Sequence, residues 1–231
     1  MNPLQNELNS KIWGHVPRRI IAFEPSASSM IIKISFQRGD KAPKLNKGKY
    51  HASINNGRNL QDKPLKLNLG CGKNIKPKSE GWINLDRIKL ADVDVVHDLN
   101  KFPYPFADNT FEEIYGSNIL EHLDDLMRVM EELHRISKPN AKIVICVPYY
   151  HSEGAFRDPT HKQFFHYLTF DYFTEGMPLS YYSKARFEII KKRTLPTFRI
   201  FKLIPDILRV PLSYFIPNLI SFLIFELRVI K

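Results

Sequence analysis

Two glycines and an aspartate, each following an apolar stretch, are the residues of this sequence best placed to bind a ligand. The run 65–72 alternates leucine with polar residues and ends in Gly70 and Gly72. Glycine lets the backbone turn sharply and approach a ligand closely, where any Cβ would intrude. Asp86 closes the next apolar stretch, fourteen residues after Gly72, and its carboxylate can accept hydrogen bonds from two ribose hydroxyls. The pattern predicts a nucleoside-binding α/β domain.

The residues around the glycines exclude two common kinds of nucleotide site. A dinucleotide fingerprint needs a small residue where this chain has Ile75. A phosphate loop of the ATPase type needs glycine at the position of Leu67 and serine or threonine at that of Asn74. The sequence therefore favours a nucleoside cofactor without a pyrophosphate, such as S-adenosylmethionine, over NAD or ATP.

The elements that position these residues follow from the hydrophobic pattern. Short apolar stretches alternate with connectors from residue 65 onward, which is typical of a parallel sheet. The predicted strands are 65–69, 82–85, 93–97, 113–117 and 142–147, with late strands at 187–191 and 198–203. An amphipathic helix is predicted over Leu123–Leu133, ending near Lys138. Only nine residues separate Gly72 from Trp82, so the first connection is predicted to be a loop or a single turn rather than a full crossover helix.

Size, cysteines and charge bound the class of protein. A chain of 231 residues has room for one α/β domain with modest additions. Its two cysteines, Cys71 and Cys146, form neither a disulfide framework nor a zinc-ligand pattern, which favours a cytoplasmic protein. The net charge is +10, with eleven Lys and Arg against four acids in 1–65 and ten against four in 173–231. Basic flanks predict an anionic partner such as a membrane, nucleic acid or phosphorylated substrate, unless they are a solvated surface.

Three regions are predicted along the chain. They are a basic, partly disordered N-terminal extension and linker (1–62), the nucleoside-binding domain (63–203) and an apolar C-terminal helical segment (204–231). The first ten residues lack the apolar run of a signal peptide. From 210 to 225 no residue is charged, although Pro211 and Pro217 interrupt the stretch. Because a spanning helix needs roughly 20 apolar residues, this segment is expected to pack on the core or to lie in a membrane interface.

From Leu65 to Phe173 the sequence resembles the class I S-adenosylmethionine-dependent methyltransferases of the small, single-domain type found in sugar and cell-surface polysaccharide pathways. The matching segments are 67–72 (LNLGCG), 84–86 (NLD), 96–99 (VHDL), 102–111 (FPYPFADNTF), 117–122 (SNILEH) and 132–140 (ELHRISKPN). Each segment alone is weak, but their order and spacing together are specific. The resemblance implies a Rossmann-like α/β fold whose mostly parallel sheet has a late antiparallel strand and helices on both faces. It also implies S-adenosyl-L-methionine as the cofactor.

The resemblance implies cofactor contacts for eight residues at the ends of the first four strands. These are Gly70, Cys71 and Gly72 around the methionine part and ribose, Asp86 at the ribose, Asp98 and Leu99 at the adenine, and Ser117 and Asn118 at the methionine end. Two of them have a plain structural alternative. Asp98 could cap a following turn, and Asp86 could be a surface acid.

A second candidate region follows the fifth predicted strand, where ligands bind in open α/β sheets. The segment 156–166 is polar and aromatic and resembles segments in methyltransferases of sugar pathways. His161 is the candidate base for an acceptor hydroxyl, with Asp158 as its orienting partner, and His122 is a further catalytic candidate. Tyr149, Tyr150, Phe164 and Phe165 could wall a sugar ring. The structural alternatives are a lid held by an Asp–His hydrogen bond and a capping or packing role for His122.

No metal site is predicted, because the spacing of His151, Asp158, His161 and His166 matches no strong ligand pattern. The sequence thus predicts a cytoplasmic O-methyltransferase acting on a sugar, glycan or related small molecule. A peripheral contact with the inner membrane surface through the C-terminal segment is part of this prediction. Two alternatives stay open: an RNA methyltransferase, motivated by the basic flanks, and a non-catalytic partner subunit that only binds S-adenosylmethionine.

Overall fold

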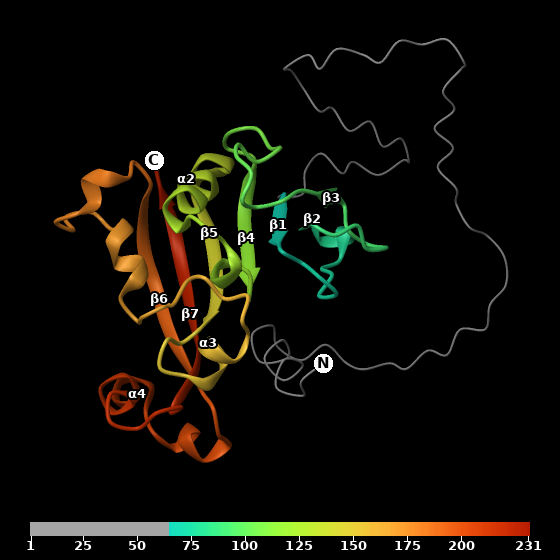
Figure 1. The fold of residues 1–231 in the computed structure, drawn as a ribbon. Coiled ribbons are helices and arrows are strands. Elements are labelled where there is room, and N and C mark those ends of the chain that lie inside the picture. Colours follow the sequence, from blue (N-terminus) through green and yellow to red (C-terminus); the bar gives the residue numbers. More distant parts are fainter. Residues whose placement is uncertain (1–64) are drawn as a thin grey trace, which may run out of the picture. The chain divides into compact units, whose positions relative to one another are not determined.

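The computed structural model describes residues 65–231, which are built around a seven-stranded sheet (Figure 1). The strands are β1 (Lys66–Leu69), β2 (Trp82–Asp86), β3 (Val95–Val96), β4 (Phe111–Ser117), β5 (Ser137–Pro148), β6 (Arg186–Pro196) and β7 (Ile220–Ile230). The α-helices are α2 (Leu126–Ile136), α3 (Glu153–Arg157) and α4 (Asp206–Ser213). The 3-10 helices are η2 (Lys78–Glu80), η3 (Leu120–His122), η4 (Thr169–Phe173), η5 (Ser180–Tyr182) and η6 (Arg199–Leu203). The predicted extension and linker at 1–62 lie outside the described residues.

The strand order is β3-β2-β1-β4-β5-β7-β6. The first five strands in this order run parallel, and β7 pairs antiparallel with both β5 and β6. The crossover falls between β1 and β4, so the chain first builds the sheet outward to β3 and then returns to the other side of β1. This is the predicted Rossmann-like sheet, mostly parallel with an antiparallel end, and that prediction is confirmed.

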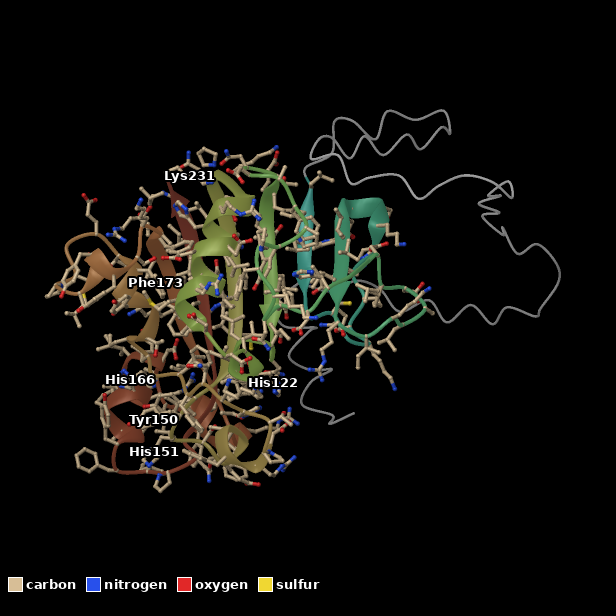
Figure 2. The ribbon with its side chains drawn as sticks, turned by 45° about the horizontal axis from the view of Figure 1, so that its top comes forward. His122, Tyr150, His151, His166, Phe173 and Lys231 are labelled. Carbon is tan, nitrogen blue, oxygen red and sulfur yellow. The ribbon has the colours of Figure 1, made fainter. Side chains whose placement is uncertain are left out.

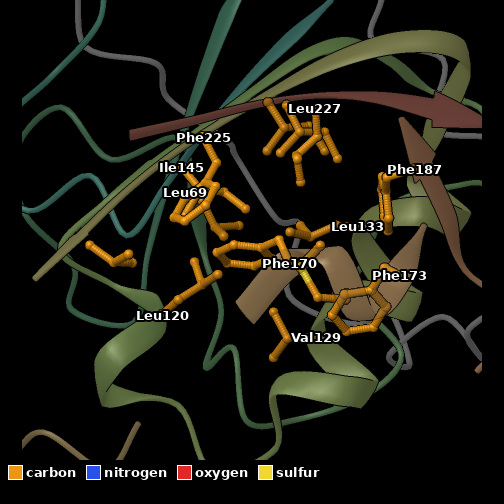
Figure 3. Packing of buried hydrophobic residues seen from close by; sticks show 14 of the residues in the cluster. Leu69, Leu120, Val129, Leu133, Ile145, Phe170, Phe173, Phe187, Phe225 and Leu227 are labelled. Carbon is orange, nitrogen blue, oxygen red and sulfur yellow. The ribbon is translucent and has the colours of Figure 1, made fainter. Parts of the chain in front are cut away.

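One face of the sheet carries the main hydrophobic core (Figure 3). The helix α2 begins at Asp125, whose side chain accepts a hydrogen bond from the backbone N–H of Arg128. Its buried residues, Val129, Met130, Leu133 and Ile136, recur at helical spacing. Together with η4 they cover alternate residues of the strands, and each buried aliphatic side chain contributes about 1.5–3 kcal/mol.

The first connection is short, as predicted, and buried amides hold it in place. Between β1 and β2 it consists of an irregular segment and the single turn η2. The Asn68 side chain donates to the Asn74 carbonyl and to the Asn84 side chain, and Asn84 exchanges two hydrogen bonds with the backbone of Lys76. These contacts satisfy backbone groups that a crossover helix would have satisfied internally.

The prediction for the end of the chain is wrong for residues 220–230. Within the predicted helical segment 204–231 only α4 is helical, and β7 runs through the sheet between β5 and β6. The domain therefore extends well beyond residue 203. Phe225, Leu227 and Val229 alternate with Glu226 and Arg228, which is the period of a strand and not of a helix. Because β7 lies between β5 and β6, both of its edges are hydrogen-bonded, and most of its apolar side chains are buried.

Two smaller differences concern the predicted strands. Residues 198–203 do not pair with the sheet and include the 3-10 helix η6, and β3 is reduced to Val95–Val96. Within residues 65–231, none of the helices has the length and apolar character that crossing a membrane requires.

Candidate active site

The carboxyl ends of β1, β2 and β4 bring the predicted cofactor residues together. Leu69 pairs with Leu85 on one side and with Gly116 on the other. The three strands therefore end level with one another, and their loops leave the same edge of the sheet. Figure 1 shows α3 and α4 lying beyond this end of the sheet, past the arrowhead of β4. Parallel α/β sheets bind ligands at this edge, beside the point where the strand order reverses.

The glycine loop after β1 requires its glycines for two different reasons. Gly70 has φ +59, and a Cβ added there would lie 2.4 Å from Cγ1 of Ile119. Gly72 has φ +48, but a Cβ there would meet nothing within 4 Å. Gly70 thus lets the loop pack against the β4 loop, and Gly72 leaves open space beside the backbone. Between them Cys71 is buried, and burial raises the pKa of its thiol to about 11.

Asp86 at the end of β2 is tied directly to the glycine loop. Its Oδ2 accepts a hydrogen bond of 2.8 Å from the Gly72 N–H, and its Oδ1 accepts one of 2.9 Å from the Ile88 N–H. A carboxylate offers about four lone-pair sites, so two acceptor sites remain after these bonds. The carboxylate is therefore held rigidly and can still accept the two ribose hydroxyls that the sequence assigns to it.

Asn118, directly after β4, presents an acceptor that has no partner. Its backbone has φ +51, and its N–H donates to the Cys146 carbonyl at 2.9 Å. Its side-chain Oδ1 is buried and receives no hydrogen bond from the described residues. Ser117 precedes it, half-buried, and pairs with Cys146 in the sheet. A buried acceptor without a donor calls for a ligand or water, and an amino group of a cofactor would satisfy it.

The two residues predicted at the adenine have structural roles of their own. Asp98 accepts a hydrogen bond from the Asn100 N–H at 3.1 Å, which is the turn-capping alternative. The Leu99 side chain is 4% exposed and belongs to the hydrophobic core. Its carbonyl accepts a hydrogen bond from Tyr104. Leu99 therefore has a packing role in the core, and its contact with the adenine stays a prediction.

Beyond the carboxyl end of β4, the structure brings together His122 from η3 and His161 from the loop after α3. The ring centroids are 4.8 Å apart. Nδ1 of His161 lies 2.9 Å from the Ala155 carbonyl, and Nδ1 of His122 lies 2.9 Å from Thr160 Oγ1. The Thr160 hydroxyl donates in turn to Asp158 at 2.7 Å. Burial and the neighbouring His161 lower the pKa of His122, which favours its neutral form.

This arrangement changes the partner expected for Asp158. Its Oδ2 lies 4.0 Å from Nε2 of His161, too far for a hydrogen bond. Asp158 instead reaches His122 through Thr160, whose hydrogen bonds lower the pKa of the carboxyl. The Ala155 carbonyl, and not Asp158, orients the His161 ring.

Sequence reasoning did not single out Glu121, the residue before His122. Its side chain is 1% exposed, and neither carboxylate oxygen has a hydrogen-bond partner among the described residues. Burial raises its pKa to about 8. The only signal in the sequence is its place beside His122, which does not reveal burial.

The aromatic residues predicted to wall an acceptor separate into two groups. Tyr149 and Phe165 are buried in the core, and Tyr150 is half-buried against it. Phe164 is 49% exposed and stacks on the exposed Phe156 with a centroid distance of 4.8 Å. The exposed pair Phe156–Phe164 is therefore the aromatic surface that an acceptor can reach, while Tyr149 and Phe165 stabilise the fold.

Two other histidines lie apart from this cluster. Figure 2 shows His151 and His166 on the side of α4, away from His122. His151 Nδ1 lies 2.7 Å from the Ser213 carbonyl, and His166 Nε2 lies 3.0 Å from Tyr214 Oη. Both imidazoles thus support the packing of the α4 region.

Comparison with known proteins gives the same domain type. The family described as "Methyltransferase domain" matches residues 78–145. A demethylmenaquinone methyltransferase of Halalkalibacterium halodurans is 31% identical over 105 residues, which cover 44% of this chain and 39% of that protein. Another of the same name from Geobacillus sp. (strain WCH70) is 38% identical over 56 residues, 24% of each chain. The chain thus aligns with less than half the length of these relatives.

Among solved structures, a SAM-dependent methyltransferase from Archaeoglobus fulgidus aligns with a TM-score of 0.48 at 19% identity, covering 72% of this chain and 86% of that one. The fold assignment does not depend on this alignment, since the strand order itself is Rossmann-like. The glycine loop, the anchored Asp86 and the unpartnered Asn118 amide fit a nucleoside cofactor with an amino-acid tail. Residues 78–145 accordingly match a methyltransferase domain, and the sheet that contains them has a Rossmann-like strand order.

Proposed function

We propose that the whole protein transfers the methyl group of S-adenosylmethionine to a hydroxyl of a sugar, glycan or related small molecule. The observation that carries this proposal is the pairing of two different sites at one edge of the sheet. Asp86 is fastened to the glycine loop on one side, and the imidazoles of His122 and His161 meet on the other. The first suits a nucleoside, and the second suits a group that must lose a proton.

The main task of the protein's side chains in this reaction is to position the cofactor and the acceptor. When bound, S-adenosylmethionine supplies a methyl group that is already activated as a sulfonium. Asp86 accepts hydrogen bonds from the ribose hydroxyls, and the side-chain Oδ1 of Asn118 accepts one from the amino group. These contacts hold the cofactor so that an acceptor oxygen can approach in line, which is the main requirement of such a displacement.

His161 takes the proton of the acceptor hydroxyl in this proposal. With its Nδ1–H donated to the Ala155 carbonyl, the lone pair of Nε2 is free to accept a proton. His122 lies beside it with its own Nδ1 held by Thr160. A neutral imidazole is an effective base near pH 7. Asp158 does not contact His161 directly but accepts a hydrogen bond from Thr160, which in turn holds His122.

The names of the sequence relatives favour a second candidate acceptor. Both of the relatives above are named demethylmenaquinone methyltransferases. An apolar quinone ring would also find the exposed Phe156–Phe164 pair attractive. The sugar proposal draws its support from the polar histidine cluster, which a carbon acceptor would need less. Turnover with a panel of sugar nucleotides, polyols and quinones separates the two.

An exposed apolar surface around η6 and α4 supports a peripheral membrane contact. Leu203, Ile207 and Phe215 are 84%, 83% and 84% exposed. Arg199 and Lys202 are also exposed on η6. Apolar side chains beside cations suit the interface of an anionic membrane. We propose on this basis a peripheral contact with a membrane, and the cytoplasmic location at the inner membrane surface is part of the same proposal.

Vesicle flotation tests this contact. The wild type should float with vesicles rich in phosphatidylglycerol and should stay below when only phosphatidylcholine is present. The variant Leu203→Ser/Ile207→Ser should lose most of the binding, whereas Tyr181→Ser, which removes a side chain 69% exposed on η5, should not. Equal flotation of all three proteins would refute the contact.

Calorimetric titration with S-adenosylhomocysteine tests the cofactor half of the function. Asp86→Ala removes two charge-assisted hydrogen bonds, each worth about 1.5–3 kcal/mol, so its affinity should fall at least about 100-fold. The matched control is Asp92→Ala, because Asp92 is an exposed acid on the next loop, and its affinity should be unchanged. No saturable binding by the folded wild type would contradict the proposal.

The acceptor half is tested by turnover of His161→Gln. This variant should bind S-adenosylhomocysteine as the wild type does and should lose at least about 100-fold in methyl transfer. Full turnover would remove His161 from the mechanism. Cofactor binding by the wild type without transfer to any acceptor would favour the non-catalytic partner subunit.

A further inference from the structure

Three potential metal ligands meet where η3 contacts the loop after α3. The ligand atoms of Glu121, His122 and His161 all lie within 4.8 Å of one another. Glu121 and His122 are adjacent in the sequence, whereas His161 is contributed by a loop 39 positions further along. The fold therefore assembles this cluster from two segments.

The Glu121 carboxylate needs a partner that the described residues do not supply. Its side chain is 1% exposed, and neither oxygen receives a hydrogen bond from them. An unsatisfied buried polar group costs about 1–3 kcal/mol, and more when it is charged. Buried charges in proteins are normally paired or bound to a metal. A cation beside Glu121 would remove this cost.

Both histidines present the form of imidazole that binds metals. Nδ1 of His161 donates to the Ala155 carbonyl at 2.9 Å, and Nδ1 of His122 donates to Thr160 Oγ1 at 2.9 Å. Each Nε2 therefore carries a lone pair. Metal-binding histidines usually donate the other ring N–H to a carbonyl, carboxylate or water, and the partners here are a carbonyl and a hydroxyl backed by Asp158.

The loop that carries His161 is fastened to η3 by several contacts. The backbone N–H groups of Lys162 and Gln163 both donate to the Glu121 carbonyl, at 2.7 and 3.0 Å. Lys162 also forms an ion pair with Asp124. Metal–ligand distances of about 2.0–2.2 Å put ligand atoms roughly 3.5 Å apart. The three side chains would thus have to approach by only about 1 Å.

We propose that Glu121, His122 and His161 bind a divalent transition-metal ion of the Zn²⁺ class through one carboxylate oxygen and the two Nε2 atoms. Two imidazoles and one carboxylate suit Zn²⁺, Fe²⁺ and Co²⁺ and leave open positions for a small ligand. The expectation of no metal came from the spacing of a different set of residues, of which His151 and His166 lie away from this cluster.

The metal site stands independently of methyl transfer, because ion binding is measured without cofactor or acceptor. It has one consequence for the acceptor. A hydroxyl bound at an open position would be acidified by the ion, which would then take over the task of the free imidazole in the same place.

Metal titration of the full-length protein, produced without a polyhistidine tag and stripped with a chelator, tests the proposal. Zn²⁺ should bind with one equivalent at micromolar affinity or tighter. Co²⁺ should develop the visible absorption of a low-symmetry nitrogen and oxygen site. Glu121→Gln and His161→Gln should each weaken Zn²⁺ binding by about 10-fold or more, with folding checked by circular dichroism.

The matched control is His134→Gln. Nε2 of His134 lies 2.7 Å from the Ile230 carbonyl, close to Lys231, at the other end of the sheet from His122 (Figure 2). This variant should bind Zn²⁺ as the wild type does. The proposal is overturned if the folded wild type takes up no stoichiometric metal. It is equally overturned if His161→Gln binds as tightly as the wild type, or if His134→Gln loses as much affinity as His161→Gln.

Discussion

The candidate site has a cofactor half, with the glycine loop and Asp86, and an acceptor half, with Glu121, His122 and His161. Each half contains a carboxylate, and the two carboxylates have opposite surroundings. In the cofactor half, Asp86 accepts hydrogen bonds from the backbone of Gly72 and Ile88. In the acceptor half, Glu121 is buried and accepts none from the described residues. The Asp86 carboxylate is therefore already stabilised by backbone donors, and a neutral ribose can still bind to it. The buried Glu121 carboxylate lacks such donors, and a bound cation or a proton would neutralise its charge.

The halves also differ in how the chain assembles them. Gly72 and Asp86 are fourteen residues apart on neighbouring strands, so one short connection sets their distance. His122 and His161 are joined by the whole of α2, β5 and α3. The cofactor half is therefore defined by local sequence, whereas the acceptor half depends on the packing of distant segments.

The sharpest test of this comparison is the pH dependence of stability in Glu121→Gln. Burial raises the pKa of Glu121 from 4.5 to about 8, so the folded protein binds this proton more tightly than the unfolded chain does. The free energy of unfolding should therefore fall as the pH rises from about 4.5 to about 8, by at most about 1.4 kcal/mol per pH unit. Glutamine removes this contribution.

The measurement is urea unfolding of both proteins in metal-free buffer at pH 5.5 and 8. The difference between variant and wild type isolates Glu121, since every other ionisable side chain is present in both proteins. The variant should gain a few kcal/mol relative to the wild type at the higher pH, and Zn²⁺ should restore the wild type. Parallel pH profiles would mean that Glu121 has a partner, and the contrast with Asp86 would disappear.

A pair of glycine variants tests the architecture of the cofactor half. Gly70→Ala puts a Cβ 2.4 Å from Ile119 at φ +59, whereas Gly72→Ala adds one in open space at φ +48. The first should cost about 3 kcal/mol of unfolding free energy, from backbone strain and overpacking, and the second about 1 kcal/mol from strain alone.

Urea unfolding measures both costs, and titration with S-adenosylhomocysteine complements it. Gly72→Ala should lose more affinity than its small stability loss suggests, because its Cβ would fill the open space beside the glycine loop, where the cofactor is proposed to bind. If the two variants lost the same stability, the close contact between the β1 and β4 loops would be incorrect.

The smallest expected effect concerns the support of His122. Thr160→Val removes the hydroxyl between His122 and Asp158. Zn²⁺ affinity should fall about 10-fold, as it does when an outer hydrogen bond to a metal-binding histidine is lost. Binding of S-adenosylhomocysteine should not change. Thr174→Val, whose hydroxyl donates to the Asp171 carbonyl in η4, serves as the control, and an equal loss there would point to a general loosening.

Particular elements explain where prediction from sequence succeeded. The strands β1, β2, β4 and β5 are apolar runs with clear breaks, and the amphipathic stripe of α2 has a helical period. Prediction failed at β7, where a long uncharged stretch suggested a helix although Phe225, Leu227 and Val229 alternate as in a strand. It also failed at Tyr149 and Phe165, because residue type does not tell a core aromatic side chain from one that lines a ligand site.

The sequence by itself determined a mostly parallel sheet and the position of Gly72 and Asp86 at the ends of its first two strands. Both follow from strand period, from glycines that tolerate positive φ, and from an acid one connection away. Only the tertiary structure decided the acceptor half. It placed His161 beside His122 and positioned the Ala155 carbonyl to accept a hydrogen bond from the His161 ring. It also left Glu121 buried without a hydrogen-bond partner among the described residues. Burial and distance between remote segments are properties of packing, and no local pattern of residues encodes them.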